Sequence, residues 1–556
     1  MKGRTVFLSL LAIVIAMVLI LAPACSSKTT TSASTPQVLR ANLGSEPDTL
    51  DPNQAAWAQD LTVIGQCFEG LLSFKTDGTL QPDIATVVPS TSNGGISSDG
   101  LTITFHLKNN VTWSDGTALT ANDFVYSIKR EVSPSLACPY ASFYFNIVGA
   151  QAYYSSASDT SDQQAALAAA VGVSAPDNYT LVIKLVAPQE TILDCMALWA
   201  VDPIRSDIVA KYGDNNWTAP PNYICDGPYI LTTWTHQTEL VLKPNPNYWG
   251  TKPKLQEIDF MEITDANAAL AAYQNNQLDI VAVPEGDYKT YLNDSSYANQ
   301  RLLVNQLATF ALEFNCTQAP FDNALVRQAF ACAVDRNAFI TDVQAGVGKV
   351  TTGWIPPGMP GYDSSAGSQY AFNPTKAKQL LAQAGYSDPS KLPAVTYTYP
   401  NTTDATTLAE FLQGQLQTNL GITVTLNPEE TNTYQSNINA GDFQLSWFGW
   451  IADYPDPDDW LLSEFTTGGG VNQTHYSNPS FDALAKQAES DLDNTTRLSD
   501  WDKAQTMMLA DAPIAPIYNS EGFSLVKPWV KGLDASTIDY SLPGDRFYDQ
   551  VSIAAH

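Results

Sequence analysis

A single apolar run at the start of the chain separates a short export segment from everything that follows. Lys2 and Arg4 precede the run, which spans residues 6–22, and small residues lead from it to Cys25. This layout is typical of a secretory signal, and the run falls just short of the ~18 apolar residues that favour a permanent membrane span. No other segment is apolar and long enough to cross a bilayer, so the remaining chain has to bury its apolar residues in cores of its own.

The cysteine after this run resembles the lipid-modified cysteine of a bacterial lipobox, with Ala22 at the position where Leu is usual and an atypical Pro23. The resemblance implies that residues 1–24 are a signal peptide and that Cys25 carries a lipid as the new N-terminus. The alternative is a plain signal peptide followed by an incidental cysteine. Residues 25–36 are mostly Ser, Thr, Ala and Lys, a composition that predicts a flexible linker.

The charge balance is strongly acidic. The chain has 28 Lys+Arg against 57 Asp+Glu, and removal of residues 1–24 takes away two cations and no acid, so the net charge of −29 becomes −31. Such a surface repels nucleic acid and anionic lipid headgroups, which argues against both as partners. Most of these acids are expected simply to keep an exported body in solution.

Cysteine and histidine usage excludes several kinds of site. Six cysteines besides Cys25 are scattered without a CxxC pair, and only four histidines are present, so the spacing of a zinc site is missing. An exported protein can form disulfides, but the sequence does not choose a pairing. HExxH, GxSxG, GxxxxGK and GxGxxG motifs are absent. We therefore expect no metal, no cofactor and no enzymatic activity.

Hydrophobic periodicity switches repeatedly between strand and helix patterns. Residues 101–107 alternate as a half-buried strand, and Thr120 and Asp123 are spaced as a capping box for a helix over 121–131. The same reasoning predicts strands at 179–186, 229–234, 238–243, 308–315, 422–426 and 444–451, and helices over 323–340, 375–385 and 406–420. This alternation indicates mixed α/β structure without internal repeats.

Acids, aromatic residues and prolines concentrate in residues 445–460, LSWFGWIADYPDPDDW. A calcium loop is excluded because its third and fifth positions would be Pro455 and Pro457, which have no side-chain oxygen. An apolar strand that ends at an acid, Asp453, fits the pattern better. An acid removed from water is costly unless it is paired, so Asp453 predicts either a cationic ligand or a salt bridge or cap within the protein.

A series of motifs in a fixed order resembles the extracytoplasmic solute-binding proteins of peptide ABC importers, notably the oligopeptide-binding type (family 5). The likeness covers nearly the whole mature chain, and the order of the motifs makes it specific. The motifs are GSEPDTLDP at 44–52, FEGLL at 68–72, FHLKNNVTWSDGT at 105–117, DFVYS at 123–127, CPYAS at 138–142, GPY at 227–229, PNYW at 246–249, APFD at 319–322, VRQA at 326–329, DR at 335–336, HYSNPSFD at 475–482 and LVKPWV at 525–530.

The resemblance implies a two-lobed α/β periplasmic-binding-protein fold with an additional N-terminal subdomain and a hinged ligand cleft. Lobe I would be discontinuous, lobe III continuous, and an extra subdomain II would be inserted between parts of lobe I. The expected boundaries are 37–73, 196–305 and 516–556 for lobe I, 74–195 for subdomain II and 306–515 for lobe III.

The resemblance also assigns ligand-binding roles. Asp453 matches the aspartate that holds the α-ammonium group of a bound peptide, and Gly449, Trp450 and Ile451 match the residues that pair with the peptide backbone as an added strand. The segment Ala56, Trp57 and Ala58 would lie on the other side of the peptide. Backbone pairing gives affinity without selecting side chains, which suits a general peptide carrier.

The other end of the site departs from the family pattern. Some relatives carry basic residues that face the ligand's carboxylate, whereas this chain has Ile438 and Trp447 at the best-matching positions and no basic residue over 402–407. The ligand is therefore longer, differently clamped, or not a peptide. The implied partners are a small solute and a membrane ABC permease with its ATPases, and the protein is expected to be a lipid-anchored monomer outside the cytoplasm.

A competing hypothesis is a secreted hydrolase of peptides or glycans that uses a carboxylate pair among Asp453, Asp456 and Asp458. The prolines between these acids predict a rigid loop that splays them outward, which disfavours two acids converging on one bond. A chaperone-like or sensory role for the same cleft is a third alternative.

Overall fold

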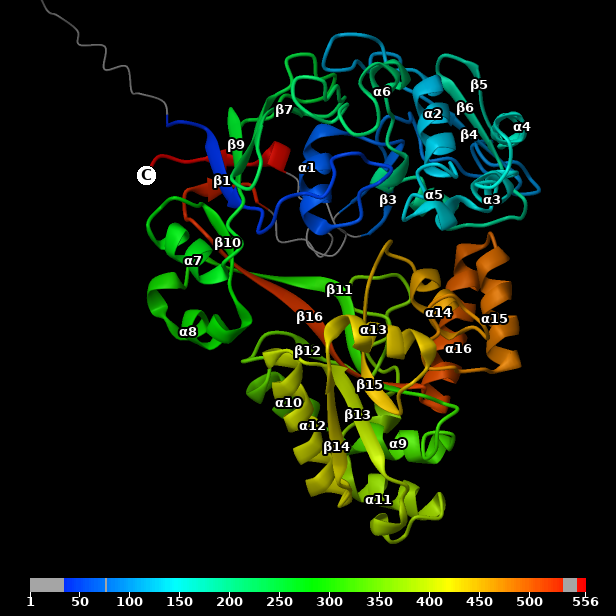
Figure 1. Cartoon of the computed structure of the whole chain (residues 1–556), viewed down its shortest axis with the longest axis vertical. Coiled ribbons are helices and arrows are strands. Elements are labelled where there is room, and N and C mark those ends of the chain that lie inside the picture. The colour runs from blue at the N-terminus through cyan, green and yellow to red at the C-terminus, as the bar shows by residue number, and fades with distance from the viewer. Residues whose placement is uncertain (1–34, 76–77, 534–547) are drawn as a thin grey trace, which may run out of the picture. The chain divides into compact units, whose positions relative to one another are not determined.

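Two long antiparallel strands, β11 (Arg301–Phe314) and β16 (Ile514–Val526), run through the middle of an 11-stranded sheet (Figure 1). The computed structural model describes residues 35–75, 78–533 and 548–556. The predicted signal peptide, Cys25 and nearly all of the predicted linker lie outside the described residues.

The sheet is mixed. The pairs β13–β14, β13–β15, β1–β9 and β1–β10 are parallel, and the other pairs are antiparallel. In order, its strands are β14 (Val424–Glu429), β13 (Val395–Pro400), β15 (Leu445–Ile451), β11, β16, β10 (Ile280–Ala282), β1 (Val38–Asn42), β9 (Glu257–Met261), β8 (Glu239–Pro244) and β7 (Tyr229–Thr235), and β12 (Lys349–Val350) pairs with β16.

The two central strands each belong to both halves of this sheet. Residues 301–305 of β11 pair with 521–525 of β16, beside β10, whereas residues 308–314 of β11 pair with β15. The β11–β16 register is irregular between Asn305 and Thr309, where the two halves meet. A β-bulge or irregularity bends a strand and increases its twist, so the sheet divides here into the two lobes of the fold.

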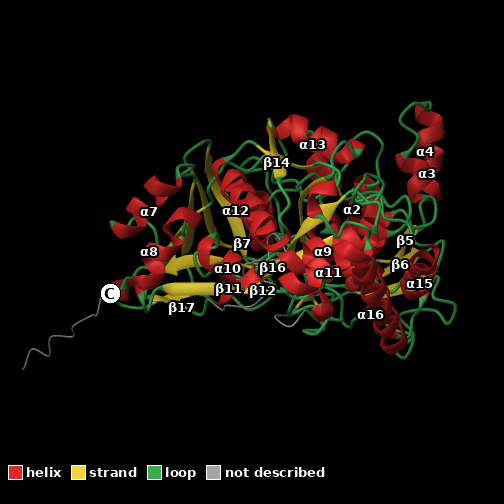
Figure 2. Ribbon diagram, turned by 90° about the horizontal axis from the view of Figure 1, so that it is seen from below, coloured by secondary structure: helices red, strands yellow, loops and turns green. Residues whose placement is uncertain are grey.

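The second lobe packs its helices around β13, β14 and β15. Figure 2, seen from the end that carries α11, shows helices of this lobe in front of its strands. These helices are α9 (Ala324–Ala333), α10 (Arg336–Asp342), α11 (Pro374–Gln383), α12 (Thr403–Leu420), α13 (Thr431–Ala440), α14 (Pro457–Phe465), α15 (Pro479–Ser490) and α16 (Asn494–Asp511).

The first lobe and the segment inserted in it carry the shorter helices and small sheets. The helices are α1 (Ala58–Cys67), α2 (Ala121–Glu131), α3 (Ala150–Tyr154), α4 (Ser161–Ala170), α5 (Ile192–Cys195), α6 (Ser206–Tyr212), α7 (Ala266–Gln274) and α8 (Tyr288–Asn293). The small sheets are β2 (Leu72–Phe74) with β3 (Leu80–Pro82); β4 (Thr102–His106), β6 (Thr180–Lys184) and β5 (Val173–Asp177); and β17 (Val530–Lys531) with β18 (Ser552–Ile553).

Local sequence signals account for several of these elements. The capping box of Thr120 and Asp123 is present at the start of α2, and Phe124 and Ile128 of that helix are fully buried. The predicted pairing of the strand at 229–234 with that at 238–243 is confirmed as β7–β8. In the described part of the chain no helix is apolar and long enough to span a membrane.

One helix prediction is wrong. Residues 323–340 form two helices, α9 and α10, because the backbone is extended at Val334. Asp335 then starts the second helix by accepting hydrogen bonds from the backbone N–H groups of Asn337 and Ala338. The buried Arg336 donates to the Pro516 carbonyl at 2.7 Å, which holds the break against β16.

Candidate functional site

The strand β15 supplies an open backbone edge. The Ala452 N–H donates to the Leu307 carbonyl at 2.9 Å, in register with the antiparallel β11–β15 ladder. In such a ladder alternate residues bond to the partner strand, so the N–H and C=O groups of Trp447, Gly449 and Ile451 point to the opposite edge.

That opposite edge has little strand pairing. Within the described residues, β13 meets β15 only at the Tyr397–Leu445 pair. The Tyr434 hydroxyl donates to the Trp447 carbonyl at 3.4 Å. Gly449 and Ile451 therefore present backbone donors and acceptors on an edge that no described strand occupies, which is the geometry that strand addition requires.

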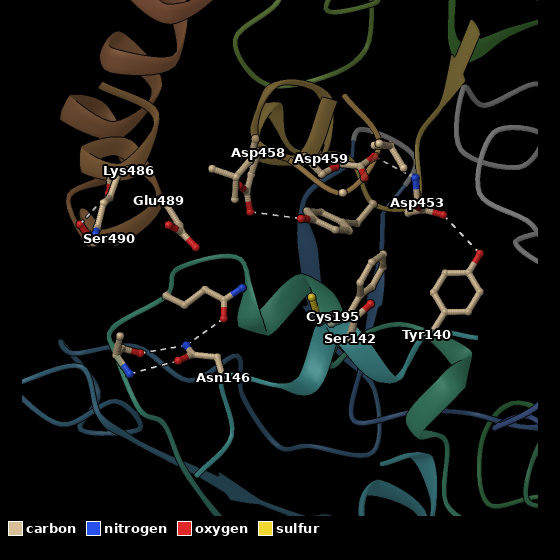
Figure 3. A pocket seen from close by; sticks show the side chains of 18 of the residues that line it. Tyr140, Ser142, Asn146, Cys195, Asp453, Asp458, Asp459, Lys486, Glu489 and Ser490 are labelled. Carbon is tan, nitrogen blue, oxygen red and sulfur yellow. Dashed lines mark hydrogen bonds between the residues drawn. The ribbon is translucent and has the colours of Figure 1, made fainter. Parts of the chain in front are cut away.

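Asp453 follows two residues after this strand, on a half-buried position. Its carboxylate accepts a hydrogen bond from the Tyr140 hydroxyl at 3.2 Å, and its backbone N–H donates to Asp459 at 2.9 Å (Figure 3). Within the described part of the chain Asp453 makes no ion pair. The side chain is thus positioned by a neutral donor, and no described residue supplies it with a counter-charge.

The electrostatics around Asp453 reflect this lack of positive charge. Burial raises the pKa of Asp453 to about 6, and the hydrogen bond from Tyr140 only partly opposes the shift. Burial, reinforced by the charge of Asp453, raises the pKa of Asp459 well above its ordinary value. Burial also holds the pKa of Glu464 well above its usual range. A cation placed here would meet three acids that form no ion pair with any described residue, and it would favour their ionised forms.

The prediction that the acids after Asp453 splay outward is wrong. Asp456, Asp458 and Asp459 are all buried, with 3–6% of each residue exposed. Asp456 caps α14 and accepts two hydrogen bonds from the Arg497 guanidinium, at 2.8 and 2.5 Å. This bidentate pair neutralises Asp456 and turns the loop inward, which a sequence pattern of alternating acids and prolines did not reveal.

Two contacts join this loop region to the segment before α5. The Thr191 hydroxyl donates to Asp458 at 2.9 Å, and Arg497 lies 3.3 Å from the Glu190 carboxylate. Residues that are about 300 positions apart along the chain therefore close one side of the site.

A pocket of about 890 Å³ lies beside Asp453 and receives residues from both segments. Its lining includes three residues predicted for the ligand site, Ala56, Trp450 and Asp453. The remaining lining residues are Pro139, Tyr140, Ser142, Phe143, Asn146, Ala187, Pro188, Gln189, Cys195, Tyr454, Asp458, Asp459, Leu462, Ser463, Gly470, Val471, Lys486, Glu489 and Ser490.

The other predicted residues lie outside this pocket. Trp57 precedes α1 and is 59% exposed, and Ala58 begins that helix in an exposed position. Gly449 and Ile451 lie on the strand edge described above. Trp447 packs among aromatic rings, 5.8 Å from Phe339 and 6.4 Å from Phe310 between ring centroids.

Glu190, Asp194 and Asp456 form a carboxylate group whose oxygens lie within 4.8 Å of one another. The Arg497 guanidinium already pairs with two of these three acids. An arginine in that position supplies the positive charge that a metal ion would bring, so the group is an ion-pair network. The six cysteines of the described region are all free thiols.

Two residues that shape the site were not identified from the sequence. Tyr140 lies within the CPYAS motif, so its position signalled the family but not its hydrogen bond to Asp453. Arg497 lies on α16, 41 residues after its partner Asp456, and no local pattern links the two.

Comparison with known proteins agrees with this architecture. Residues 79–472 match the bacterial extracellular solute-binding proteins, family 5 (middle region). The chain is 30% identical to the oligopeptide-binding protein OppA of Bacillus subtilis (strain 168) over 488 residues, covering 86% of this chain and 87% of OppA. It is 32% identical to the periplasmic murein peptide-binding protein MppA of Escherichia coli (strain K12) over 509 residues, covering 89% of this chain and 90% of MppA.

A solved structure shares the fold over almost the whole chain. The unliganded open form of MppA, a periplasmic murein tripeptide binding protein, superposes with a TM-score of 0.80 at 30% identity, covering 94% of this chain and 98% of that one. The family match spans more than half of the sequence, and the relatives are covered nearly end to end. This chain belongs to family 5 of the bacterial extracellular solute-binding proteins.

Proposed function

We propose that this protein captures oligopeptides outside the cytoplasm and delivers them to the permease of an ABC importer. The observation that carries the proposal is Asp453, a half-buried acid that forms no ion pair among the described residues, next to a strand edge that no described strand occupies. The names of its relatives, an oligopeptide-binding protein and a murein peptide-binding protein, point to the same ligand class.

In the proposed complex the peptide's α-ammonium group pairs with Asp453 beside Tyr140. The peptide backbone then continues β15 along Gly449 and Ile451, with Trp450 and the Ala56–Ala58 segment flanking it. Charge-assisted hydrogen bonds of this type contribute about 1.5–3 kcal/mol each, so the amine fixes the register while the backbone bonds add affinity for any sequence.

In this proposal the carboxylate end of the ligand is held differently from that in relatives with basic residues facing it. Ile438 is buried at 2% exposure, and Trp447 stacks with Phe310 at an interplanar angle of 15°. Neither side chain carries a positive charge that could form an ion pair with a carboxylate. A peptide bound at Asp453 would therefore extend past an aromatic surface here, without a basic side chain from these two positions to end it.

We propose that lobe I comprises residues 37–73, 196–305 and 516–556, subdomain II residues 74–195, and lobe III residues 306–515. The irregular register between Asn305 and Thr309 supports a hinge in β11 at the first boundary of lobe III. Similarity to an unliganded open form supports an open arrangement of the lobes that closes over ligand.

The proposed partners beyond the peptide follow from the family. They are an ABC permease with its ATPases and the membrane, reached through a lipid on Cys25 and the linker that follows it. A monomer suffices for this role, and the acidic net charge of −29 argues against nucleic acid as a partner.

Native mass spectrometry of the purified protein tests the proposal. The protein is incubated with a defined peptide mixture, and the bound species are then released and fragmented. We expect intact peptides to be recovered with unchanged masses. Steady fragmentation of the mixture would instead support the hydrolase alternative, which none of the comparisons supports.

A further inference from the structure

The pocket beside Asp453 is far more acidic than one ammonium group requires. Four carboxylates line it, those of Asp453, Asp458, Asp459 and Glu489, against a single cation, Lys486. Lys486 is exposed, so water screens its charge, whereas Asp458 and Asp459 are buried. A second cationic group on a ligand would meet a favourable field throughout this volume.

Among the pocket acids, Asp458 has a carboxylate oxygen that could accept a further hydrogen bond. It is 3% exposed, and its Oδ2 atom accepts hydrogen bonds from the hydroxyls of Thr191 at 2.9 Å and Tyr454 at 3.1 Å. Its Oδ1 atom is buried and has no hydrogen-bond partner in the part of the chain that the structure describes. Figure 3 shows the carboxylate directed into the pocket, on the side where Glu489 lies.

An unpartnered carboxylate oxygen away from water is costly, and its cost is recovered when a donor reaches it. Burial and the nearby charge of Asp456 raise the pKa of Asp458 to about 7, which is the behaviour of an acid with no cation beside it. Arg497, which pairs with the neighbouring Asp456, is committed to that acid and to Glu190.

The pocket also has apolar walls that suit an aliphatic stem. Phe143 and Tyr454 meet edge to face with centroids 5.8 Å apart, and Pro188, Leu462 and Val471 complete the apolar lining. Lysine and arginine side chains pack their methylene groups on such surfaces while their charged ends reach polar partners.

We infer that Asp458 forms a second cation subsite, so that the preferred ligands are peptides whose first residue carries a long cationic side chain. The α-ammonium group binds Asp453, the stem lies against Phe143 and Tyr454, and the side-chain cation donates to Asp458 with Glu489 nearby. This inference rests on the proposed function, because it needs the peptide amine at Asp453.

A matched pair of tripeptides isolates the side-chain charge. Lys-Ala-Ala and norleucine-Ala-Ala share the aliphatic stem and differ at the terminal ammonium, and both are titrated into the full mature protein by calorimetry. We expect the lysine peptide to bind about tenfold more tightly, the effect of one charge-assisted hydrogen bond.

The variant Asp458→Asn removes the charge and keeps an acceptor for Thr191 and Tyr454, so the local fold is retained. It should reduce the lysine-to-norleucine ratio to below about threefold while norleucine-Ala-Ala binds nearly as before. Asp502→Asn, an exposed position on α16 outside the pocket, is the charge-matched control and should keep the full ratio.

A ratio near one in the unmodified protein, or a ratio that Asp458→Asn leaves unchanged, would overturn the inference. If norleucine-Ala-Ala binds in either case, the peptide-binding function stands and only the second subsite fails. If neither tripeptide binds, the proposed function itself fails, and the second subsite fails with it.

Discussion

At the scale of single residues, the charge of Asp453 is in conflict with its surroundings in the unliganded protein. It is half-buried, which disfavours its charge, and the donor to its carboxylate within the described residues is neutral, the Tyr140 hydroxyl. An ammonium ion resolves this conflict because it restores the interaction that water would have supplied. The residue is better suited to a ligand than to stabilising the fold.

This conflict makes peptide affinity depend on pH. Bound ammonium favours ionised Asp453, so its pKa, about 6 in the free protein, falls in the complex. Affinity is therefore full above pH 6 and is lost as the pH falls through that value. Calorimetry with trialanine should show Kd rising about tenfold between pH 7 and pH 5.

The α-amino group of the peptide stays protonated over this range, so it adds no slope of its own. In Asp453→Asn the dependence should become much weaker, because the carboxylate that pairs with the peptide amine is gone. An equally steep dependence in the variant would assign the proton to another group and remove Asp453 from the explanation.

Arg497 is the residue on which the acidic loop depends. It is 2% exposed and holds Asp456 and Glu190 together. Arg497→Met leaves the buried Asp456 and the half-buried Glu190 without this counter-charge, so the free energy of unfolding should fall by about 3–5 kcal/mol in urea titrations. Lys243→Met removes an exposed partner of Glu257 and should cost less than about 1 kcal/mol. Equal losses in the two variants would contradict this assignment.

At the scale of elements, the packing of β15 against β11 depends on a glycine, Gly449, as much as on the side chains of the strand. A Cβ atom at Gly449 would lie 2.3 Å from ring atoms of Phe310 on the neighbouring strand. Phe310 cannot easily move away, because its ring stacks against Trp447 and Tyr518. The glycine thus permits an aromatic layer to pack flat beside the open edge.

Gly449→Ala should consequently destabilise the protein by about 1–3 kcal/mol and weaken peptide binding, as measured by thermal unfolding and calorimetry. Gly414, within α12, has open space where an alanine methyl group would lie, so Gly414→Ala should instead raise stability slightly. A neutral effect at Gly449 would mean that Phe310 adjusts and that the layer is not constrained.

Elements were predictable where local signals agree with the tertiary structure. The strand near residues 101–107 and the helix over 121–131 appear as β4 and α2 because alternation and a capping box leave little choice. The prediction of a single helix over 323–340 failed because Asp335 caps a new helix inside an amphipathic pattern. The first half of β11 was missed because residues 301–307 show no clean alternation, although Val304 and Leu307 are buried.

The site was predictable only in part, and for a related reason. Asp453, Trp450 and Ala56 line one pocket, and the ligand-binding roles that the family resemblance assigns to them stay predictions. The burial of Asp456 and Asp458 was not foreseen, since their partners, Arg497 and Thr191, come from distant elements. Long-range pairing of charges leaves no periodic trace in a single sequence.

At the scale of the whole molecule, the paired strands β11 and β16 link the two lobes, and the site lies where segments from both meet. Closure around a peptide would bury both the amine anchor and the open strand edge. Small-angle X-ray scattering should show a smaller radius of gyration after saturation with peptide, because the lobes approach each other. An unchanged radius with ligand bound would contradict a hinged trap.

The central claim is that a peptide's free amine is held by Asp453, and a double cycle of ligand and protein tests it most directly. Trialanine and N-acetyl-trialanine are titrated into the unmodified protein and into Asp453→Asn. Acetylation should weaken binding about 10- to 100-fold in the unmodified protein and less than about threefold in the variant. Equal losses on acetylation in both proteins would show that Asp453 does not hold the amine.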